Sequence, residues 1–117
     1  MGPPSTWRGA EMEAKSFSPG RLLATPGVLA AVSRERLLKC LEAHLSGNWG
    51  DALGQEDWKL NTEATHTGAR LLSSYWIDPQ DHSAGRFWII TEAEGETEDG
   101  TGTLSRAATT IILPEEY

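Results

Sequence analysis

The chain has 117 residues, a formal net charge of −7 and 38% hydrophobic residues, with five Trp and a single Cys. This length favours one domain, and the aromatic and aliphatic content is enough for a hydrophobic core, which excludes a wholly disordered chain. No run approaches the roughly 20 apolar residues of a membrane span, and one cysteine cannot close an intrachain disulfide. We therefore expect a cytoplasmic protein with no membrane contact.

The acidity is concentrated in one segment. Five acidic residues and no basic residue lie within Glu92–Asp99, which leaves a net charge of −2 for the rest of the chain. A nucleic-acid site needs clustered Lys and Arg, so we expect no direct nucleic-acid binding. We interpret the acidic loop as a solvated insertion rather than a mimic of nucleic-acid phosphates; its residues are Glu94, Glu96, Glu98 and Asp99.

Residues 1–16 contain Gly, Pro and Ser and show little hydrophobic periodicity. This composition predicts a flexible N-terminal extension. The segment lacks the apolar stretch of a signal peptide. We expect a single α+β domain over residues 17–117.

Local signals predict an edge strand and a first helix near the start of the domain. Gly20–Ala24 is a short apolar run of strand type. Thr25 then fits the N-cap of a short helix through Val28–Val32, with Pro26 at its first helical position, where the missing N–H of proline costs nothing.

A longer helix is predicted to begin after Ser33, which is a second N-cap residue. Its apolar stripe consists of Leu37, Leu38, Leu41, His44 and Leu45. Gly47 suits the position just past the helix end, where a left-handed conformation is common. A further helix is expected from near Gln55 to Gly68.

Three strand-like runs follow: Ala69–Ile77, Arg86–Glu92 and Ala107–Leu113. Asp78–Gly85 has a turn composition, and Ala93–Thr103 is an acidic, Gly- and Thr-rich connection. Runs joined in this way favour an antiparallel meander. The predicted fold class is α+β, with N-terminal helices packed on a C-terminal antiparallel sheet of three to four strands.

The sequence contains no recognised catalytic or metal-binding motif. A P-loop, GxSxG, HExxH and paired CxxC are all absent. His44, His66 and His82 lack the spacing of a ligand set, and Cys40 lies among leucines like a small hydrophobe. We assign no catalytic residue, expect neither a metal nor a cofactor, and favour a non-enzyme.

His44 is the most informative single residue, because it interrupts a leucine stripe. One interpretation is a core histidine that is hydrogen-bonded to a carbonyl or carboxylate. The other is a general base or ligand facing a pocket near Trp49. Asp57 and Asn61 share a helix face, so they fit either a first-turn acid with a loop-tying amide or a pair that orients a ligand.

Polar residues of the strand region extend this set. We expect Arg106 and Glu92 to form a cross-strand ion pair. Alternatively, these two residues line a polar pocket together with Ser73 and Tyr75. The candidate functional pocket therefore comprises His44, Trp49, Asp57, Asn61, Ser73, Tyr75, Glu92 and Arg106.

Five short segments carry a family resemblance: His44–Asp51 (HLSGNWGD), Glu56-Asp57 with Asn61, Leu71–Tyr75 (LLSSY), Trp88–Glu92 (WIITE) and Thr109–Tyr117 (TTIILPEEY). Over residues 17–117 this ordered pattern resembles a group of small uncharacterised bacterial proteins carried on plasmids, phages and integrated elements. Some of them are labelled as type I restriction–modification subunits. The resemblance implies a mobile-element setting but no established activity.

The chain departs from that group in two places. The group has a short connection where this chain has the long acidic segment Ala93–Ser105, and the N-terminal extension is individual. No Gly-rich cofactor loop follows a predicted strand, which excludes a methyltransferase.

Three functions fit these observations. The first is a small acidic accessory protein of a mobile element that binds a host or element-encoded protein, such as a component of host defence or restriction. The second is a small enzyme or ligand-binding domain built on the candidate pocket. The third is a structural or regulatory homodimer with the last strand at the interface.

Overall fold

The computed structural model describes residues 17–97 and 99–117. The predicted flexible extension over residues 1–16 and Glu98 of the acidic loop lie outside the described residues. The predicted α+β class is confirmed, because in this described part three helices precede the antiparallel strands that form most of one sheet.

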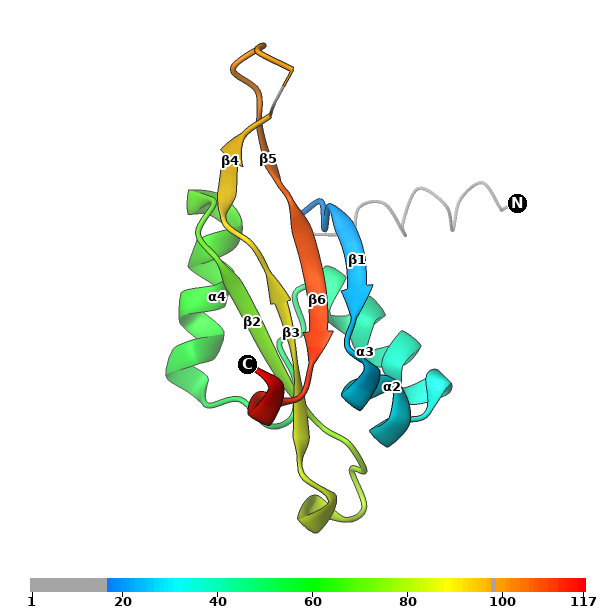
Figure 1. The fold of residues 1–117 in the computed structure, drawn as a ribbon. Helices are drawn as coiled ribbons and strands as arrows, with labels where there is room; N and C mark the ends of the chain where they lie inside the picture. Colours follow the sequence, from blue (N-terminus) through cyan, green and yellow to red (C-terminus); the bar gives the residue numbers. More distant parts are fainter. Residues whose placement is uncertain (1–16, 98) are drawn as a thin grey trace, which may run out of the picture.

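The main sheet has four strands in the order β1-β6-β3-β2 (Figure 1). The strands are β1 (Arg21–Ala24), β2 (Leu71–Trp76), β3 (Arg86–Thr91) and β6 (Ala108–Ile112). The antiparallel meander of β2, β3 and β6 is as predicted, and β1 is the predicted edge strand. Its direction differs from the expected antiparallel sheet, since β1 runs parallel to β6. No hairpin joins these two strands, so no turn fixes their relative direction.

The helices are α2 (Pro26–Ala31), α3 (Arg34–Leu45) and α4 (Gln55–Thr67). Their predicted boundaries are confirmed by the caps. The side chains of Thr25 and Ser33 accept hydrogen bonds from main-chain N–H groups in the first turns of α2 and α3. Gly68 ends α4 with a φ of 81°, a left-handed conformation that glycine adopts without steric cost.

The acidic connection between β3 and β6 differs from the predicted loop. It contains β4 (Glu94–Glu96) and β5 (Leu104–Arg106), which pair antiparallel as a second small sheet. Figure 1 shows this hairpin projecting beyond the body of the protein. Because β3 and β6 are antiparallel neighbours, their connection is itself a long hairpin, and main-chain pairing continues into it despite a Glu- and Gly-rich sequence with low strand propensity.

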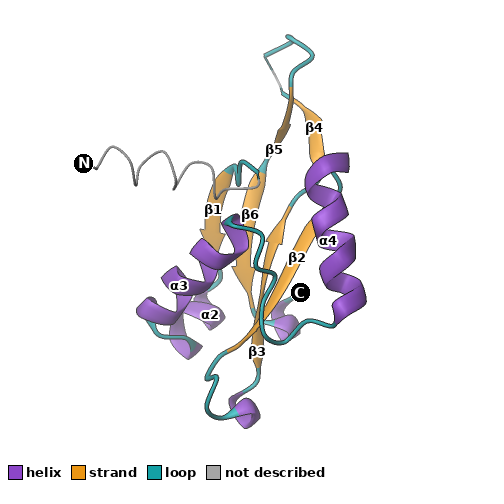
Figure 2. Cartoon of the chain, turned by 180° about the vertical axis from the view of Figure 1, so that it is seen from behind, coloured by secondary structure: helices purple, strands orange, loops and turns teal. Residues whose placement is uncertain are grey.

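Among the described residues, the helices cover one face of the main sheet, and the opposite face carries only the C-terminal 3₁₀ turn η2 (Pro114–Glu116). Figure 2, seen from behind, shows α2 and α3 over β1 and β6, with α4 beside β2. A smaller cluster around Trp49 packs against α4. The main core lies under α2 and α3; its buried residues are Val28, Val32, Leu37, Cys40, Tyr75, Phe87, Ile89 and Ile111.

The outer edge of β2 is closed by side chains and by the loop before α4. The Nδ2 of Asn61 donates to the carbonyl of Leu72 (2.6 Å), and its Oδ1 accepts from the N–H of the same residue (3.0 Å). Two residues further along, the N–H of Ser74 donates to the carbonyl of Trp49, and the carbonyl of Ser74 accepts from Ala52 (3.0 Å each). These bonds replace the missing neighbouring strand.

The third outward-facing residue of β2 is Trp76. Its main-chain N–H and C=O are hydrogen-bonded to the two members of an ion pair. Asp51 accepts from the N–H of Trp76 (2.9 Å), and Arg36 donates to its carbonyl through Nε (3.0 Å) and Nη2 (2.8 Å). Arg36 and Asp51 also bond each other at 3.1 Å. All three outward-facing residues of β2 are therefore paired, and the edge offers no groups for another strand.

Replacing Asn61 with Ala should lower the free energy of unfolding by about 2 kcal/mol, because the main-chain donor and acceptor of Leu72 both lose their partner. Asn61→Asp keeps the acceptor, so its free energy of unfolding should lie between those of the parent and Asn61→Ala. Urea unfolding measures the change. Glu63→Ala on the exposed face of α4 is the control and should stay within about 0.5 kcal/mol of the parent. Equal stability of Asn61→Ala and Glu63→Ala would mean that the edge clamp contributes nothing.

Candidate functional site

His44 lies on the inner face of α3 with 0% of its surface exposed. Two aromatic rings enclose it: Phe17 at 5.2 Å and Trp49 at 5.5 Å between ring centroids, both in edge-to-face geometry. The first interpretation of this residue, a hydrogen-bonded core histidine, describes this setting. Its partners are side-chain hydroxyls rather than the carbonyl or carboxylate that we expected.

A chain of hydrogen bonds passes through the His44 ring. Nδ1 is bonded to the hydroxyl of Ser73 on β2, and Nε2 lies 2.8 Å from the hydroxyl of Thr91 on β3. Thr91 is bonded to Thr109 on β6 (2.7 Å), and Thr109 donates to the carbonyl of Pro19 (2.8 Å). One helix, three strands and the segment before β1 are thus connected through a single imidazole.

The end of this chain determines where its protons lie. The carbonyl of Pro19 can only accept, so it takes the hydroxyl proton of Thr109. Thr109 must then accept from Thr91, and Thr91 from Nε2 of His44. Nδ1 is left to accept the proton of Ser73. Every bond has one donor and one acceptor, and His44 is the neutral Nε2–H tautomer.

Burial and, to a smaller extent, the positive charge of Arg106 together lower the pKa of His44 from 6.5 to about 3. The described structure places no carboxylate on the ring; its bonded partners are the hydroxyls of Ser73 and Thr91. A proton on Nδ1 would also displace the donor of Ser73. The ring therefore has neither the proton affinity nor the access to solvent that a general base needs.

Arg106 is the second buried polar residue of the set, with 5% of its surface exposed. Its guanidinium donates to three main-chain carbonyls: those of Ala69 (2.7 Å) and Glu92 (3.0 Å) through Nη1, and that of Ala64 (3.0 Å) through Nη2. Its Cζ lies 5.7 Å from the ring centroid of Phe17. The carbonyl of Ala64 belongs to the last turn of α4, where the helix dipole favours a cation.

The predicted ion pair between Arg106 and Glu92 does not form, although the two residues are hydrogen-bonded. Arg106 bonds the main-chain oxygen of Glu92 and not its carboxylate, and the one ion pair in the described part of the chain joins Arg36 to Asp51. The side chain of Glu92 is exposed because it points to the opposite face of the strand end. Burial lowers the pKa of Arg106, partly offset by the nearby carboxylate of Glu94.

Trp49 and Tyr75 belong to the same buried region. The indole N–H of Trp49 donates to the hydroxyl of Thr62 (3.2 Å), and the Tyr75 hydroxyl donates to the carbonyl of Asn48 (2.7 Å). Burial raises the pKa of Tyr75 well above its usual range. Tyr75 thus ties the loop before α4 to β2, and Trp49 ties it to α4.

Asp57 lies apart from this region. It lines an exposed hollow of about 380 Å³ with Leu53, Leu60, Asn61, Arg70 and Leu72. Glu92 lies at a different hollow of about 320 Å³, where Arg70 donates to the hydroxyl of Tyr117 (2.6 Å). The structure therefore brings together His44, Trp49, Ser73, Tyr75 and Arg106 in the interior, uses Asn61 at the edge of β2, and leaves Asp57 and Glu92 on the surface.

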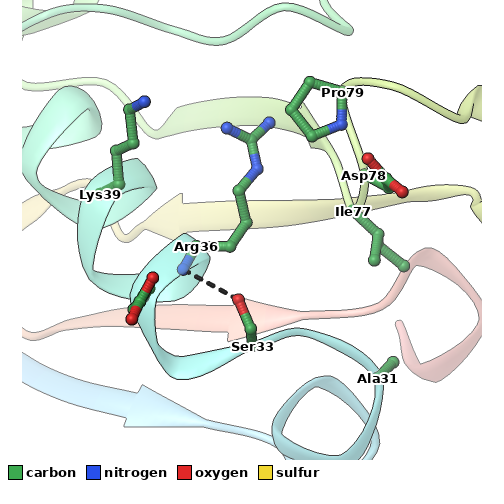
Figure 3. A pocket seen from close by; sticks show the side chains of 8 residues that line it. Ala31, Ser33, Arg36, Lys39, Ile77, Asp78 and Pro79 are labelled. Atoms are coloured by element: carbon green, nitrogen blue, oxygen red, sulfur yellow. Dashed lines mark hydrogen bonds between the residues drawn. The ribbon is translucent and has the colours of Figure 1, made fainter.

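A broader hollow of about 490 Å³ lies at the start of α3, opposite the turn after β2 (Figure 3). Two of its polar side chains have structural roles. Ser33 accepts from the N–H of Arg36 as the helix cap, and the guanidinium of Arg36 is bonded to the carbonyl of Trp76 and to Asp51. None of the candidate pocket residues lines this hollow.

Within residues 17–97 and 99–117, no group of three or more His, Cys, Asp or Glu side chains is placed to hold a metal ion. Burial raises the pKa of the Cys40 thiol to about 11, so it stays protonated and unreactive near neutral pH. None of the helices in this part of the chain has the length and apolar character needed to cross a membrane.

Comparison with known proteins gives no match: no family model, no curated protein and no solved structure matches the chain.

Four participants in the buried network are not in the predicted set: Phe17, Pro19, Thr91 and Thr109. The signal for the two threonines was present, because each lies two residues from an isoleucine of the core on its strand, so its hydroxyl faces the same side. Phe17 and Pro19 gave no such signal, since they lie in an irregular segment.

Two neighbouring buried serines give a matched test of the network. Ser73 is bonded to His44, whereas the hydroxyl of Ser74 has no partner among the described residues. Ser73→Ala should lower the free energy of unfolding by about 1–3 kcal/mol, because Nδ1 of His44 loses its donor. Ser74→Ala should be neutral or slightly stabilising. Chemical denaturation of both variants measures the difference, and equal losses would contradict the network as described.

The free energy of unfolding should fall by about 1.4 kcal/mol per pH unit as the pH drops below 6.5 towards 3. The lowered pKa of His44 means that the unfolded chain binds a proton in this range while the folded protein does not. Above pH 6.5 the effect should vanish. Urea unfolding between about pH 7 and pH 5 measures it, since carboxylates with a lowered pKa such as Glu116 protonate below that window.

His44→Gln should remove this slope between about pH 7 and pH 5, whereas His82→Gln on the exposed 3₁₀ turn η1 (His82–Ala84) should keep it. A parent protein of constant stability across this window would contradict a buried, neutral His44 in the folded protein. A His44→Gln variant that retains the slope would do so as well.

Proposed function

We propose that the chain acts by binding another protein rather than by catalysis, as a small cytoplasmic accessory protein of a mobile element. Its partner would be a host or element-encoded protein, such as a component of host defence or restriction. The mobile-element setting rests on the ordered sequence segments from His44–Asp51 to Thr109–Tyr117. The binding role rests on how the structure distributes polar and apolar side chains.

The observation that carries the proposal is a contrast between the interior and the surface of β1, α2 and α3. The residues with chemical capacity are bonded inside the protein, where His44, Ser73 and Thr91 each have 0% exposure. On β1, α2 and α3, four large apolar side chains remain between 41% and 59% exposed: Leu22, Leu23, Leu29 and Leu38. Leu29 and Leu38 line one apolar hollow, Leu22 lies on the same face of the sheet, and Leu23 lies on the opposite face of β1. Exposed apolar patches are typical of sites that bind other proteins.

The enzyme alternative has less support. It needs an open pocket on which the candidate residues converge. Those that do converge fill the space between α3 and the sheet, and their donors and acceptors are matched one to one. The homodimer alternative placed the last strand at an interface, but β6 lies between β1 and β3, so both of its edges are already paired.

Affinity capture tests the proposal. The full chain, tagged and incubated with lysates of several bacterial hosts, should recover one saturable partner in about equimolar amount. Tyr75→Phe should recover the same partner, because it removes only a buried hydroxyl that an enzyme built on the candidate pocket would need. Reconstitution with the purified partner should reproduce the complex. Consistent absence of any stoichiometric partner would refute the binding role.

A further inference from the structure

The two edges of the main sheet differ. Hydrogen bonds of Arg21 and Thr25 to the carbonyls of Ala107 and Ile111 fix the side of β1 that faces β6. By the two-residue period of a strand, the main-chain groups of Leu22 and Ala24 point away from the sheet. No described residue bonds them, whereas every outward-facing residue of β2 is paired.

An apolar groove runs beside this open edge. It has a volume of about 360 Å³ and lies between β1 and the helices α2 and α3. Its rim includes the exposed Leu29 and Leu38, and Arg34 is its one charged residue. The lining residues are Ala24, Leu29, Val32, Arg34, Leu37, Leu38, Leu41 and Ile111. Ala24 and Ile111 are neighbours in the register of β1 and β6, so the groove lies on the helix-covered face of the sheet.

The charged residues on the open edge strand and in the groove are basic. Arg21 lies on β1, and Arg34 is the one charged residue that lines the groove, whereas the whole chain has a net charge of −7. The carboxylate of Glu116, near the end of β1, is already bonded to Thr25 and Gly27. An acidic segment is therefore attracted to this edge through Arg21 and Arg34.

We propose that the β1 edge and its groove bind an extended, acidic and apolar segment of the partner protein as a fifth strand of the sheet. This mode uses main-chain hydrogen bonds for affinity and side-chain pockets on alternate residues for specificity. It rests on the proposed binding function and gives that function a surface and a ligand chemistry. A second copy of the chain fits less well, because pairing β1 with itself would bring the basic residues of both copies together.

The register defines the pattern of the ligand. In an antiparallel fifth strand, the residues opposite Ala24 and Leu22 lie on the groove side, so both should be apolar and two positions apart. The residue after the second apolar one lies opposite Arg21 on the other face and should be acidic. The expected segment is thus apolar, any residue, apolar, acidic.

Fluorescence polarisation with the full chain tests this inference. The probe is a fluorescein-labelled eight-residue peptide with valine at its third and fifth positions, aspartate at its sixth and seventh, and serine or threonine elsewhere. It should bind saturably. A peptide with lysine in place of both aspartates, and a peptide with the two valines adjacent, should each bind at least tenfold more weakly.

Matched variants place the site. Leu38→Glu should weaken binding at least tenfold, whereas Leu60→Glu on α4, a residue of similar exposure, should leave it unchanged. Ala24→Pro removes an outward-facing N–H without breaking the pairing with β6, and should also weaken binding. Circular dichroism confirms that each variant is folded.

Equal binding by Leu38→Glu and Leu60→Glu, or tight binding of the lysine peptide, would overturn the inference. So would light scattering that shows a dimer in the parent and a monomer in Leu38→Glu, because the second copy would then occupy the groove. A stoichiometric partner in affinity capture together with no peptide binding would leave the proposed function standing and remove this surface. Peptide binding without any captured partner would support this surface and contradict the proposed function.

Discussion

The fold depends on one buried imidazole. His44 comes from a helix, yet its two nitrogens bind hydroxyls on two different strands, and the chain of bonds continues to a third strand and to the carbonyl of Pro19. A polar ring in an apolar core is costly unless every donor and acceptor is satisfied. Because only one arrangement of protons satisfies them here, the network fixes the position of α3 over the sheet more specifically than leucine packing alone would.

This use of polar residues determines what the protein can offer a partner. The buried serine, threonines, tyrosine and arginine are bonded to one another, to His44 or to main-chain carbonyls, so they do not form an open active site. Their contribution is to the precise position of helices and loops on the sheet. The exposed large apolar side chains of the described surface are Leu22, Leu23, Leu29 and Leu38 on β1, α2 and α3, together with Leu60, Leu104 and Tyr117 elsewhere. The acidic residues are concentrated in the connection between β3 and β6.

The sequence was sufficient where local chemistry decides the structure. Thr25, Ser33 and Gly68 mark helix ends through bonds and torsions within a few residues. The predicted stripe of α3 was correct only in part: Leu37 and His44 are buried, whereas Leu38 is 56% exposed because it lies at the rim of a hollow and not under the helix. The sequence was not sufficient where distant segments meet. The main-chain partners of Arg106, the parallel direction of β1 and the pairing of β4 with β5 all depend on the assembled sheet. His44 was recognised as unusual, but its partners are 29 and 47 residues away and could not be deduced.

The closed edge of β2 has a consequence for self-assembly. A sheet with two available edges can add strands from successive molecules and grow without limit, as in fibrils. In this sheet, Asn61, Asp51 and the loop around Trp49 already occupy one side, so an added strand on the β1 side has no counterpart through which a further molecule could continue. Copies of this chain therefore cannot join the β1 edge of one molecule to the β2 edge of the next, and the main sheet cannot extend head to tail into a fibril.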